Sequence, residues 1–429
     1  MRIRQGIRRV RRQSRGERFI VGTPHVLIIV QNLPLPLDRR VWLECQALRD
    51  AGYEVSVICP KGPGDVPYQL LDGIHLYKYR PAPQANGVLG YLLEFSYSWL
   101  RTARLSLRVW RRRPFAVIQA CNPPDTYWAL ARLWRARGVR FVFDHHDLNP
   151  ELYLSRFGEP TRLAGRLQLA ALRWLERRTF RTAQRVISTN ESYRRVALER
   201  GGVPREHTAV VRSGPDTTVM RPGDPVPALR RGAEHLVVYL GIMGPQDGVD
   251  SILDVAHDII AARGRTDIRF ALLGFGDCLA ELRIRCTELG LDEHVEFTGR
   301  ADPAMIGDYL STASVGLAPD SFSPLNDVST MNKVMEYMAY ALPVVTFRLA
   351  ETMVSLGDCG VCVESGDVSG FADEVVRLVD DADRRTALGA AARSRAEQVL
   401  DWRPQATAYV GVFDDLFGRT GSELVRTGE

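Results

Sequence analysis

Residues 323–347, SPLNDVSTMNKVMEYMAYALPVVTF, join a polar loop, a helical pattern and a short apolar run. Ser329 and Thr330 are suitable N-cap residues, and apolar side chains then recur at helical spacing over the next ten positions. Pro343 ends the helical pattern, and residues 344–347 are typical of a buried strand. The stretch therefore predicts a loop that leads into a helix N-terminus, and a helix that leads back into a sheet.

This predicted helix N-terminus is a candidate anion site, because it offers unpaired backbone N–H groups and a positive dipole end. Lys333 lies in its first turn, and Glu336 follows on the same face. The two side chains could hold a phosphate and a pair of sugar hydroxyls. The same pattern also fits an ordinary capped core helix with a solvated lysine and glutamate, so this stretch alone does not distinguish an anion site from a core helix.

Length and composition indicate a soluble protein of two or three globular domains. The chain has 429 residues, of which 45% are hydrophobic and 25% are charged. Its seven cysteines are scattered and odd in number, which excludes a disulfide scaffold and fits a reducing compartment. The pair Cys359 and Cys362 has no second pair or histidines nearby, so a metal or redox role is not favoured.

Positive charge is concentrated at the start of the chain. The first 18 residues hold eight arginines and one glutamate, whereas the remainder holds 48 basic and 50 acidic residues. We expect residues 1–20 to be a disordered tail that nucleic acid or an anionic membrane could attract. The tail has no apolar core of a signal peptide, and no apolar run is long enough to predict a transmembrane helix.

Residues 90–113 form a basic amphipathic pattern with two interpretations. Apolar residues, including Trp99 and Trp110, recur at helical spacing, and arginines recur on another face. Such a helix can lie on an anionic bilayer, or it can pack on a sheet with arginines extending from its rim. The sequence leaves both open.

Strands and helices alternate in two series, which predicts two doubly wound parallel sheets. The first series begins with strands at 25–30 and 54–59, and the second begins with strands at 235–240 and 268–273. A segment at 216–234, rich in Pro, Gly and charged residues, is typical of a linker between domains.

A polar motif, DHHD at 144–147, follows the predicted strand 139–143. Ligands of open α/β sheets bind beyond the carboxyl ends of strands, so one of these side chains is expected to face a ligand. His145 and His146 point to opposite sides of a strand, which is poor geometry for joint ligation of a metal ion, and we predict no metal site.

The motifs together resemble those of the family 4 retaining glycosyltransferases, over roughly residues 25–417. The family fold, GT-B, has two Rossmann-like doubly wound domains that face a central cleft, and a C-terminal helix that crosses back to the first domain. The resemblance implies an N-terminal acceptor domain at 21–212 with a helix at 402–417, and a nucleotide-sugar donor domain at 213–401. The motifs are DRRVWLE at 38–44, DHHD at 144–147, SGPD at 213–216, GFG at 274–276, FTGR at 297–300, NKVMEYMA at 332–339, PVV at 343–345 and GD at 366–367.

The resemblance implies transfer of a hexose from a nucleotide diphosphate sugar to an acceptor, with retention at the anomeric carbon and without a metal ion or other cofactor. Glu336 is expected to hold the ribose hydroxyls. Lys333 and the N–H groups near residues 329–332 are expected to bind the diphosphate, and residues 298–300 are expected to border the base. The residues expected at the donor are Gly241, Gly244, Gly248, Arg300, Asn326, Ser329, Thr330, Asn332, Lys333 and Glu336.

The first domain is expected to contribute His146, which corresponds to the family's histidine beside the transferred sugar and would orient or stabilise the departing donor. With Lys333 and Asp327 it forms the expected catalytic set. The residues expected near the acceptor or the sugar are Asp38, Arg39, Asp144, His145 and Asp147.

Two positions depart from the family pattern. Val328 stands where many members have a glutamate that touches the donor sugar, so Asn326 or Asp327 is expected to take that contact. Ile242 and Asp247 stand where many members have an arginine and a lysine in the turn after the first strand of the donor domain. The negative charge of the phosphates must then be neutralised by Lys333, and Arg212 and Arg300 are further candidates for this role.

The expected partners are the donor and a lipid-linked or cell-surface glycan precursor, with an anionic membrane reached through the tail and residues 90–113. We expect no nucleic-acid partner. The expected location is the cytoplasm, at the inner face of the cell membrane. Two alternatives stay open: a GT-B nucleotide-sugar epimerase, and a non-catalytic protein that binds nucleotide sugars or anionic surfaces.

Overall fold

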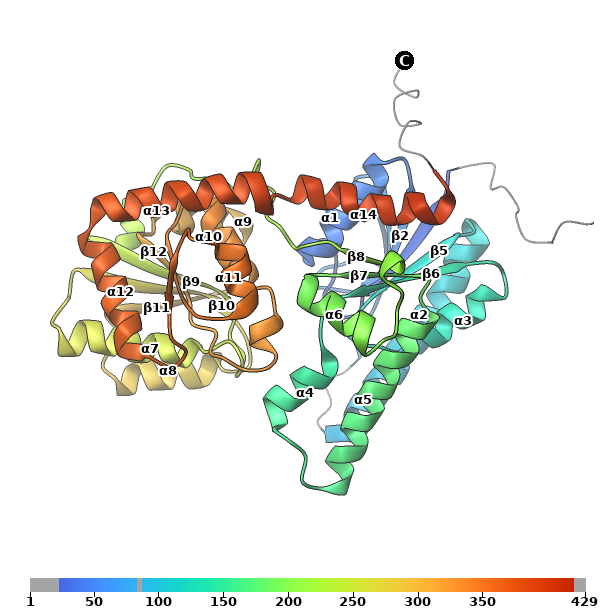
Figure 1. The fold of residues 1–429 in the computed structure, drawn as a ribbon, viewed down its shortest axis with the longest axis horizontal. Coiled ribbons are helices and arrows are strands. Elements are labelled where there is room, and N and C mark those ends of the chain that lie inside the picture. Colours follow the sequence, from blue (N-terminus) through green and yellow to red (C-terminus); the bar gives the residue numbers. More distant parts are fainter. Residues whose placement is uncertain (1–22, 83–86, 420–429) are drawn as a thin grey trace, which may run out of the picture.

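The computed structural model describes residues 23–82 and 87–419, so the predicted tail at 1–20 lies outside the described residues. The chain forms two α/β domains that lie side by side, with the helices that end the chain running along one edge of both (Figure 1). The GT-B architecture predicted from the sequence is confirmed.

The first domain is built on an eight-stranded sheet of order β3-β4-β2-β1-β5-β6-β7-β8. All neighbours pair in parallel except β3 and β4. Its strands are β1 His25–Ile29, β2 Glu54–Pro60, β3 Tyr68–Leu71, β4 Ile74–Tyr79, β5 Val117–Cys121, β6 Arg140–His145, β7 Arg185–Ser188 and β8 Thr208–Val210. Its helices are α1 Arg39–Asp50, α2 Gly87–Arg112, α3 Trp128–Arg135, α4 Asn149–Phe157, α5 Leu163–Thr182 and α6 Glu191–Glu199.

The second domain has a six-stranded, wholly parallel sheet of order β11-β10-β9-β12-β13-β14. Its strands are β9 His235–Ile242, β10 Ile268–Phe275, β11 Val295–Gly299, β12 Val315–Ala318, β13 Val344–Phe347 and β14 Val361–Val363. Its helices, followed by the last helix of the chain, are α7 Val249–His257, α8 Leu279–Glu288, α9 Pro303–Thr312, α10 Asn332–Ala339, α11 Ala350–Leu356, α12 Val368–Asp380, α13 Ala382–Arg395 and α14 Trp402–Phe417.

The strands are apolar on both faces of each sheet, so both faces are covered by helices. In the first domain α1 and α14 cover one face, and α2 and α3 cover the other. The last helix, α14, returns from the second domain, and Tyr53 of the first domain packs on Phe413 and donates a hydrogen bond to Asp414 (2.6 Å). The predicted C-terminal crossover is therefore present.

The chain passes between the domains twice, and the two passages lie against each other. The backbone N–H of Trp402 donates to the carbonyl of Pro215 (3.0 Å), and Asp401 accepts hydrogen bonds from Thr217. A side chain at Gly214 would collide with the carbonyl of Leu400. The close approach of two backbones explains the glycine at this point of the linker.

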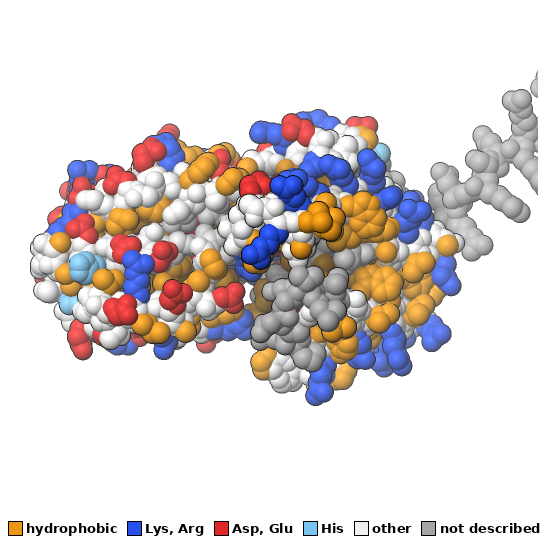
Figure 2. Space-filling view, turned by 90° about the horizontal axis from the view of Figure 1, so that it is seen from below, with side chains coloured by type: hydrophobic (Ala, Val, Ile, Leu, Met, Phe, Trp, Pro, Cys, Tyr) orange, Lys and Arg blue, Asp and Glu red, His pale blue; other side chains and the backbone are white. Residues whose placement is uncertain are grey.

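The predicted amphipathic helix at 90–113 forms as α2, and its apolar residues are divided between the core and the surface. Trp99, Ala103 and Trp110 pack against the core, whereas Leu93, Leu100 and Leu107 are exposed. Figure 2 shows orange patches bordered by blue on the half of the molecule that belongs to the first domain. A search of the described residues finds no helix with the length and apolar character needed to cross a membrane.

Candidate active site between the two domains

The carboxyl ends of β6, β9 and β12 meet the start of α1 and of α10 where the two domains face each other. Arg39 of α1 forms an ion pair with Glu336 of α10 (2.6 Å). The next residue, Arg40, donates to Nε2 of His146, which directly follows β6 (3.0 Å). Two adjacent arginines thus bring the predicted ribose ligand and the predicted catalytic histidine to one place.

Lys333 is the buried cation of this site. Its ammonium group lies 2.7 and 2.8 Å from the two carboxylate oxygens of Asp320, which follows β12, and 5.1 Å from the centroid of the Tyr239 ring. Burial alone would lower the pKa of Lys333, but Asp320 and Asp247 raise it above its ordinary value. The lysine is therefore a fixed positive charge beside the first turn of α10.

The predicted N-cap of α10 is wrong. The helix begins at Asn332, Met331 is its N-cap residue, and no side chain caps it. Ser329 instead donates to the carbonyl of Leu325 (2.7 Å), and Thr330 accepts a hydrogen bond from Asn190 of the first domain (3.0 Å). No side chain caps the N-terminus of α10, which is the arrangement that the predicted anion site requires.

The loop before α10 holds the domains together. The Val328 carbonyl accepts a hydrogen bond from Asn190 (2.9 Å), and the Val328 side chain packs beside Leu148, Tyr193 and Leu325. A position that many family members give to a glutamate thus serves as an apolar contact between domains.

The two residues predicted to replace that glutamate have structural partners. Asn326 is buried and donates to the carbonyls of Gln246 and Ser321 (both 2.9 Å). Asp327 accepts a hydrogen bond from the backbone N–H of Ala350 (2.8 Å), at the start of α11. Asn326 therefore fastens two loops together, and the Asp327 carboxylate is directed to a helix N-terminus.

Glycines let the backbone approach Lys333 closely. A Cβ atom at Gly241 would lie 2.8 Å from the Tyr239 hydroxyl and 3.1 Å from Cε of Lys333. Gly248 adopts φ +64°, and a side chain there would collide with the carbonyl of Pro319. Gly244 donates its N–H to Asp247 (2.9 Å). The three predicted glycines thus shape the turn that faces the lysine.

Asp247 adds negative charge to this turn. Burial raises its pKa to about 6, although Lys333 acts in the opposite direction. Because its pKa is raised in the folded state, ionisation of Asp247 costs stability as the pH rises from about 4 to about 6.

We predict that this carboxyl group makes donor binding pH-dependent. Above pH 6 the carboxylate repels the diphosphate, so affinity for a nucleotide sugar should fall as the pH rises from 5 to 7. Asp247→Asn should bind about three- to tenfold more tightly at pH 7.5 and lose this dependence. Calorimetry across the range is the measurement, Asp250→Asn on the exposed side of α7 is the control, and an Asp247→Asn profile like that of the parent would contradict the prediction.

Two exposed apolar side chains, Ile242 and Phe275, lie at the ends of β9 and β10. Ile242 and Phe275 are paired in register and are 48% and 36% exposed. The guanidinium of Arg300 lies 4.3 Å from the centroid of the Phe275 ring. An aromatic ring and a planar cation suit the flat face of a nucleotide base, and Arg300 is one of the residues 298–300 that are expected to contact the base.

Of the two adjacent histidines, only His146 is accessible. Its Nε2 lies 2.7 Å from Oδ2 of Asp144, and its side chain is 15% exposed. His145 is fully buried among Phe143, Phe180 and Tyr193. Burial lowers the pKa of His145 to about 3, and neither ring nitrogen has a hydrogen-bond partner among the described residues. His145 therefore belongs to the core, contrary to its expected place near the acceptor.

The other predicted acceptor residues have mixed positions. Asp38 caps α1 by accepting from the N–H of Val41 (3.1 Å). Asp144 is fully buried, and Asp147 is partly exposed beside His146. Arg39 is 41% exposed and reaches across to the second domain. Asp38, Arg39 and Asp147 therefore have surface that a ligand could contact, whereas Asp144 and His145 do not.

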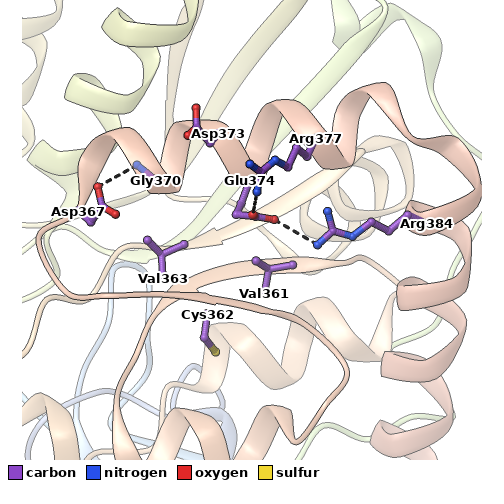
Figure 3. A pocket seen from close by; sticks show the side chains of 9 residues that line it. All are labelled: Val361, Cys362, Val363, Asp367, Gly370, Asp373, Glu374, Arg377 and Arg384. Carbon is purple, nitrogen blue, oxygen red and sulfur yellow. Dashed lines mark hydrogen bonds and ion pairs between the residues drawn. The ribbon is translucent and has the colours of Figure 1, made fainter.

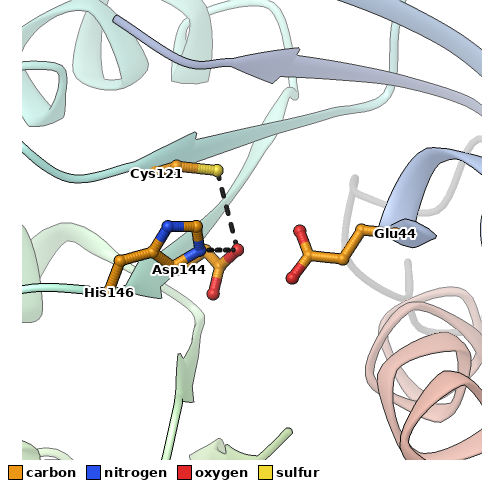
Figure 4. Close-up of side chains that lie close together, drawn as sticks. All are labelled: Glu44, Cys121, Asp144 and His146. Carbon is orange, nitrogen blue, oxygen red and sulfur yellow. Dashed lines mark hydrogen bonds and ion pairs between the residues drawn. The ribbon is translucent and has the colours of Figure 1, made fainter. Parts of the chain in front are cut away.

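Figure 4 shows a cluster of potential metal ligands, whose donor atoms lie within 4.8 Å of one another: Glu44, Cys121, Asp144 and His146. The Arg40 guanidinium lies 3.0 Å from Glu44, 3.2 Å from Asp144 and 3.0 Å from His146. A cation is thus already present among these groups, and the cluster does not indicate a metal ion.

The sequence did not indicate Ser192 and Glu351, because they act across the domain boundary. Ser192 donates to Glu351 of α11 (2.7 Å), which also pairs with Arg212 (3.2 Å), one of the candidates for the phosphate charge. A pocket of about 310 Å³ lies elsewhere, between β14, α12 and α13 (Figure 3), where Glu374 pairs with Arg377 and Arg384. Both arginines of this pocket are paired with Glu374, so neither is free to hold a phosphate.

The two facing α/β domains, with a last helix that returns to the first domain, define a GT-B protein. A family model described as "Glycosyltransferase Family 4" matches residues 37–219, and one described as "Glycosyl transferases group 1" matches residues 234–381. The chain belongs to the family 4 glycosyltransferases.

Among curated relatives, the D-inositol 3-phosphate glycosyltransferase of Thermobispora bispora is 25% identical over 87% of this chain and 88% of that protein. Two others of that name, from Catenulispora acidiphila and Acidothermus cellulolyticus, match over 63% and 53% of their own lengths at 27% and 25% identity. Among solved structures, sucrose-phosphate synthase from Thermosynechococcus elongatus has a TM-score of 0.71 at 17% identity, covering 92% of this chain and 100% of that one. Anabaena HepE in complex with UDP-glucose has a TM-score of 0.65 at 16% identity, covering 92% and 99%. These structures support the fold.

Proposed function

We propose that this protein transfers a sugar from a nucleotide diphosphate sugar to an acceptor hydroxyl, with retention of anomeric configuration. The observation that carries the proposal is the arrangement of α10. Its uncapped N-terminus and buried Lys333 suit a diphosphate, Glu336 on the same helix suits a ribose diol, and His146 approaches from the other domain.

Donor binding on this arrangement requires one contact to open. Glu336 is paired with Arg39, so the ribose hydroxyls must displace the guanidinium from the carboxylate. Arg39, exposed and released, is then close to the incoming phosphates. This cation from the first domain compensates in part for Asp247, which stands where many family members have a lysine.

The reaction breaks the bond between the anomeric carbon and the diphosphate oxygen and forms a bond from that carbon to the acceptor oxygen. The acceptor proton passes to the leaving diphosphate. Lys333 and the N–H groups of α10 stabilise the negative charge that develops on this group, which is the role that a metal ion has in other transferases. His146 orients the sugar on the opposite side.

The test is a thermal-shift panel of nucleotide sugars that includes UDP-glucose and GDP-mannose, because a ligand of the native state raises the midpoint by mass action. The stabilising donor is then incubated with candidate acceptors, and the anomeric configuration of the product is read by NMR. We expect one donor to bind and its sugar to be transferred with retention. Conversion of the donor without an acceptor would indicate an epimerase, and no binding by any donor would indicate a non-catalytic protein.

We further propose that the acceptor is lipid-linked and is met at the inner face of the cell membrane. Relatives include a phosphatidyl-myo-inositol mannosyltransferase of Mycobacterium leprae, 28% identical over 44% of this chain and 48% of that protein. In this chain Leu93, Leu100 and Leu107, seven residues apart on α2, are 63%, 63% and 44% exposed. They form one stripe on a helix rich in arginine, which suits an anionic bilayer.

A second stripe lies on α5 and supports the same proposal. Leu163, Leu167 and Trp174 are 72%, 62% and 49% exposed and fall on one helical face. Arg178 lies 5.4 Å from the centroid of the Trp174 ring, and the single acidic residue of α5, Glu176, is buried. Tryptophan and arginine are typical of the membrane interface.

We predict that Leu163→Ser/Leu167→Ser weakens binding to vesicles that contain phosphatidylglycerol by about tenfold, because apolar area and charge both contribute to interfacial binding. Flotation at low and high salt is the measurement. Ile284→Ser, which changes an equally exposed residue of α8 in the second domain, should have no effect. Equal binding by the double variant and the parent would contradict the role of α5, and equal binding after removal of residues 1–18 would contradict that of the tail.

A further inference from the structure

Arg40 lies directly behind His146, in the buried cluster whose acidic members appear in Figure 4. Its side chain is 9% exposed. Its Nε atom is 3.0 Å from Nε2 of His146 and 3.0 Å from Oε1 of Glu44, and its Nη2 atom is 3.2 Å from Oδ1 of Asp144. One guanidinium thus contacts the histidine and two carboxyl groups.

The same guanidinium also reaches the chain segment that leads into the second domain. Nη1 donates to the carbonyl of Val211 (2.8 Å) and to Oγ of Ser213 (3.0 Å). Both acceptors follow the last strand of the first sheet. The position of His146 is therefore connected to the interdomain linker through a single side chain.

Both contacts of the His146 ring are made at Nε2. An arginine Nε–H can only donate, so Nε2 of His146 accepts from Arg40 only when unprotonated, whereas Asp144 accepts from Nε2 only when it carries hydrogen. Arg40 and Asp144 therefore compete for the same ring nitrogen, and the position of the guanidinium decides how the ring is held. Burial would raise the pKa of Asp144, but the charges of His146 and Arg40 lower it below its ordinary range, which favours a carboxylate as the acceptor.

The remaining groups of the cluster support this arrangement. Gln119 donates through Nε2 to Glu44 (2.8 Å) and Asp144 (2.9 Å), and its Oε1 accepts from the hydroxyl of Tyr409 of α14 (2.5 Å). Burial raises the pKa of Glu44 well above its ordinary value.

We propose that Arg40 is a positioning residue for sugar transfer: it holds Asp144 against Nε2 of His146 and ties this pair to the linker, so that Nδ1 is the ring nitrogen presented to the sugar. The inference rests on the proposed function for its consequence, but its geometry does not depend on it. A lysine at position 40 keeps the charge but cannot make the forked contacts.

The experiment compares Arg40→Lys with Arg49→Lys, a matched change on the exposed side of the same helix. Steady-state kinetics with the donor from the nucleotide-sugar panel gives kcat and KM. Nitrogen NMR of protein labelled in its histidine rings gives the tautomer, and the His146 signal is identified by its loss in His146→Gln. For Arg40→Lys we expect kcat to fall about 30-fold with donor KM nearly unchanged, and the ring-nitrogen shifts of His146 to change because Nε2 loses its contact with Arg40. Arg49→Lys should match the parent.

Ser213→Ala keeps the buried cluster intact and tests the linker contact even where Arg40→Lys fails to fold. We expect kcat to fall about threefold with an unchanged melting temperature. The inference is overturned when the ring-nitrogen shifts of His146 are the same in Arg40→Lys and the parent, or when the folded variants keep the kcat of the parent. A parent protein that transfers no sugar contradicts the proposed function, and the NMR comparison of Arg40→Lys with the parent still decides the role of Arg40.

Discussion

Lys333→Met should lower kcat/KM for the nucleotide sugar by about 10²–10³-fold, because the variant loses the fixed charge that stabilises the departing diphosphate. It should also be less stable, by about 3–5 kcal/mol, since Asp320 then remains as a buried carboxylate without its partner. Asp320 is 1% exposed and contacts the ammonium group with both oxygens. Transfer kinetics and urea denaturation measure the two effects.

A double variant separates these effects. Lys333→Met/Asp320→Asn removes both charges and should recover most of the stability without recovering activity, because a neutral amide needs no cation. Activity that returned with stability would show that Lys333 serves only the fold. Near-normal kinetics in stable Lys333→Met would likewise contradict a role in phosphate binding.

His146→Ala should lower kcat by about 10²–10³-fold while the donor dissociation constant changes little. The histidine belongs to the first domain, whereas Lys333 and Glu336, the proposed phosphate and ribose ligands, belong to the second. We therefore expect donor binding to depend on the second domain, and the transfer step to depend also on His146 of the first domain. Calorimetry with the donor and single-turnover transfer measure the two quantities.

The neighbouring histidine provides the control. His145→Phe replaces a fully buried ring, packed among aromatic side chains, that has two unpaired nitrogens. The change removes buried polar atoms without partners, so stability should stay the same or rise, and kcat should stay within about twofold. Equal loss of kcat in both variants would mean that the loop, and not the His146 ring, matters.

Much of the fold followed from local patterns. The alternation of buried strands and helices predicted both sheets, because a strand buried on two faces must be apolar along its length. The short edge strands Tyr68–Leu71 and Val361–Val363 were not predicted, because few apolar contacts mark them. The helix Asn149–Phe157 was also missed, since it begins inside a polar motif. The cap of α10 was assigned to Ser329 and Thr330 because both fit the local rule, but their hydroxyls have other partners.

By itself, the sequence determined the two α/β domains, the family, and the residue types of the donor helix, since these depend on periodicity and on spacing along one helix. Only the tertiary structure decided that Lys333 is paired with Asp320, that Arg39 covers Glu336, and that His146 and not His145 is accessible. It also placed Val328 in a contact between domains and Asp327 at another helix. The physical reason is that each of these outcomes depends on partners far away in the chain, whose distance and burial no local pattern contains.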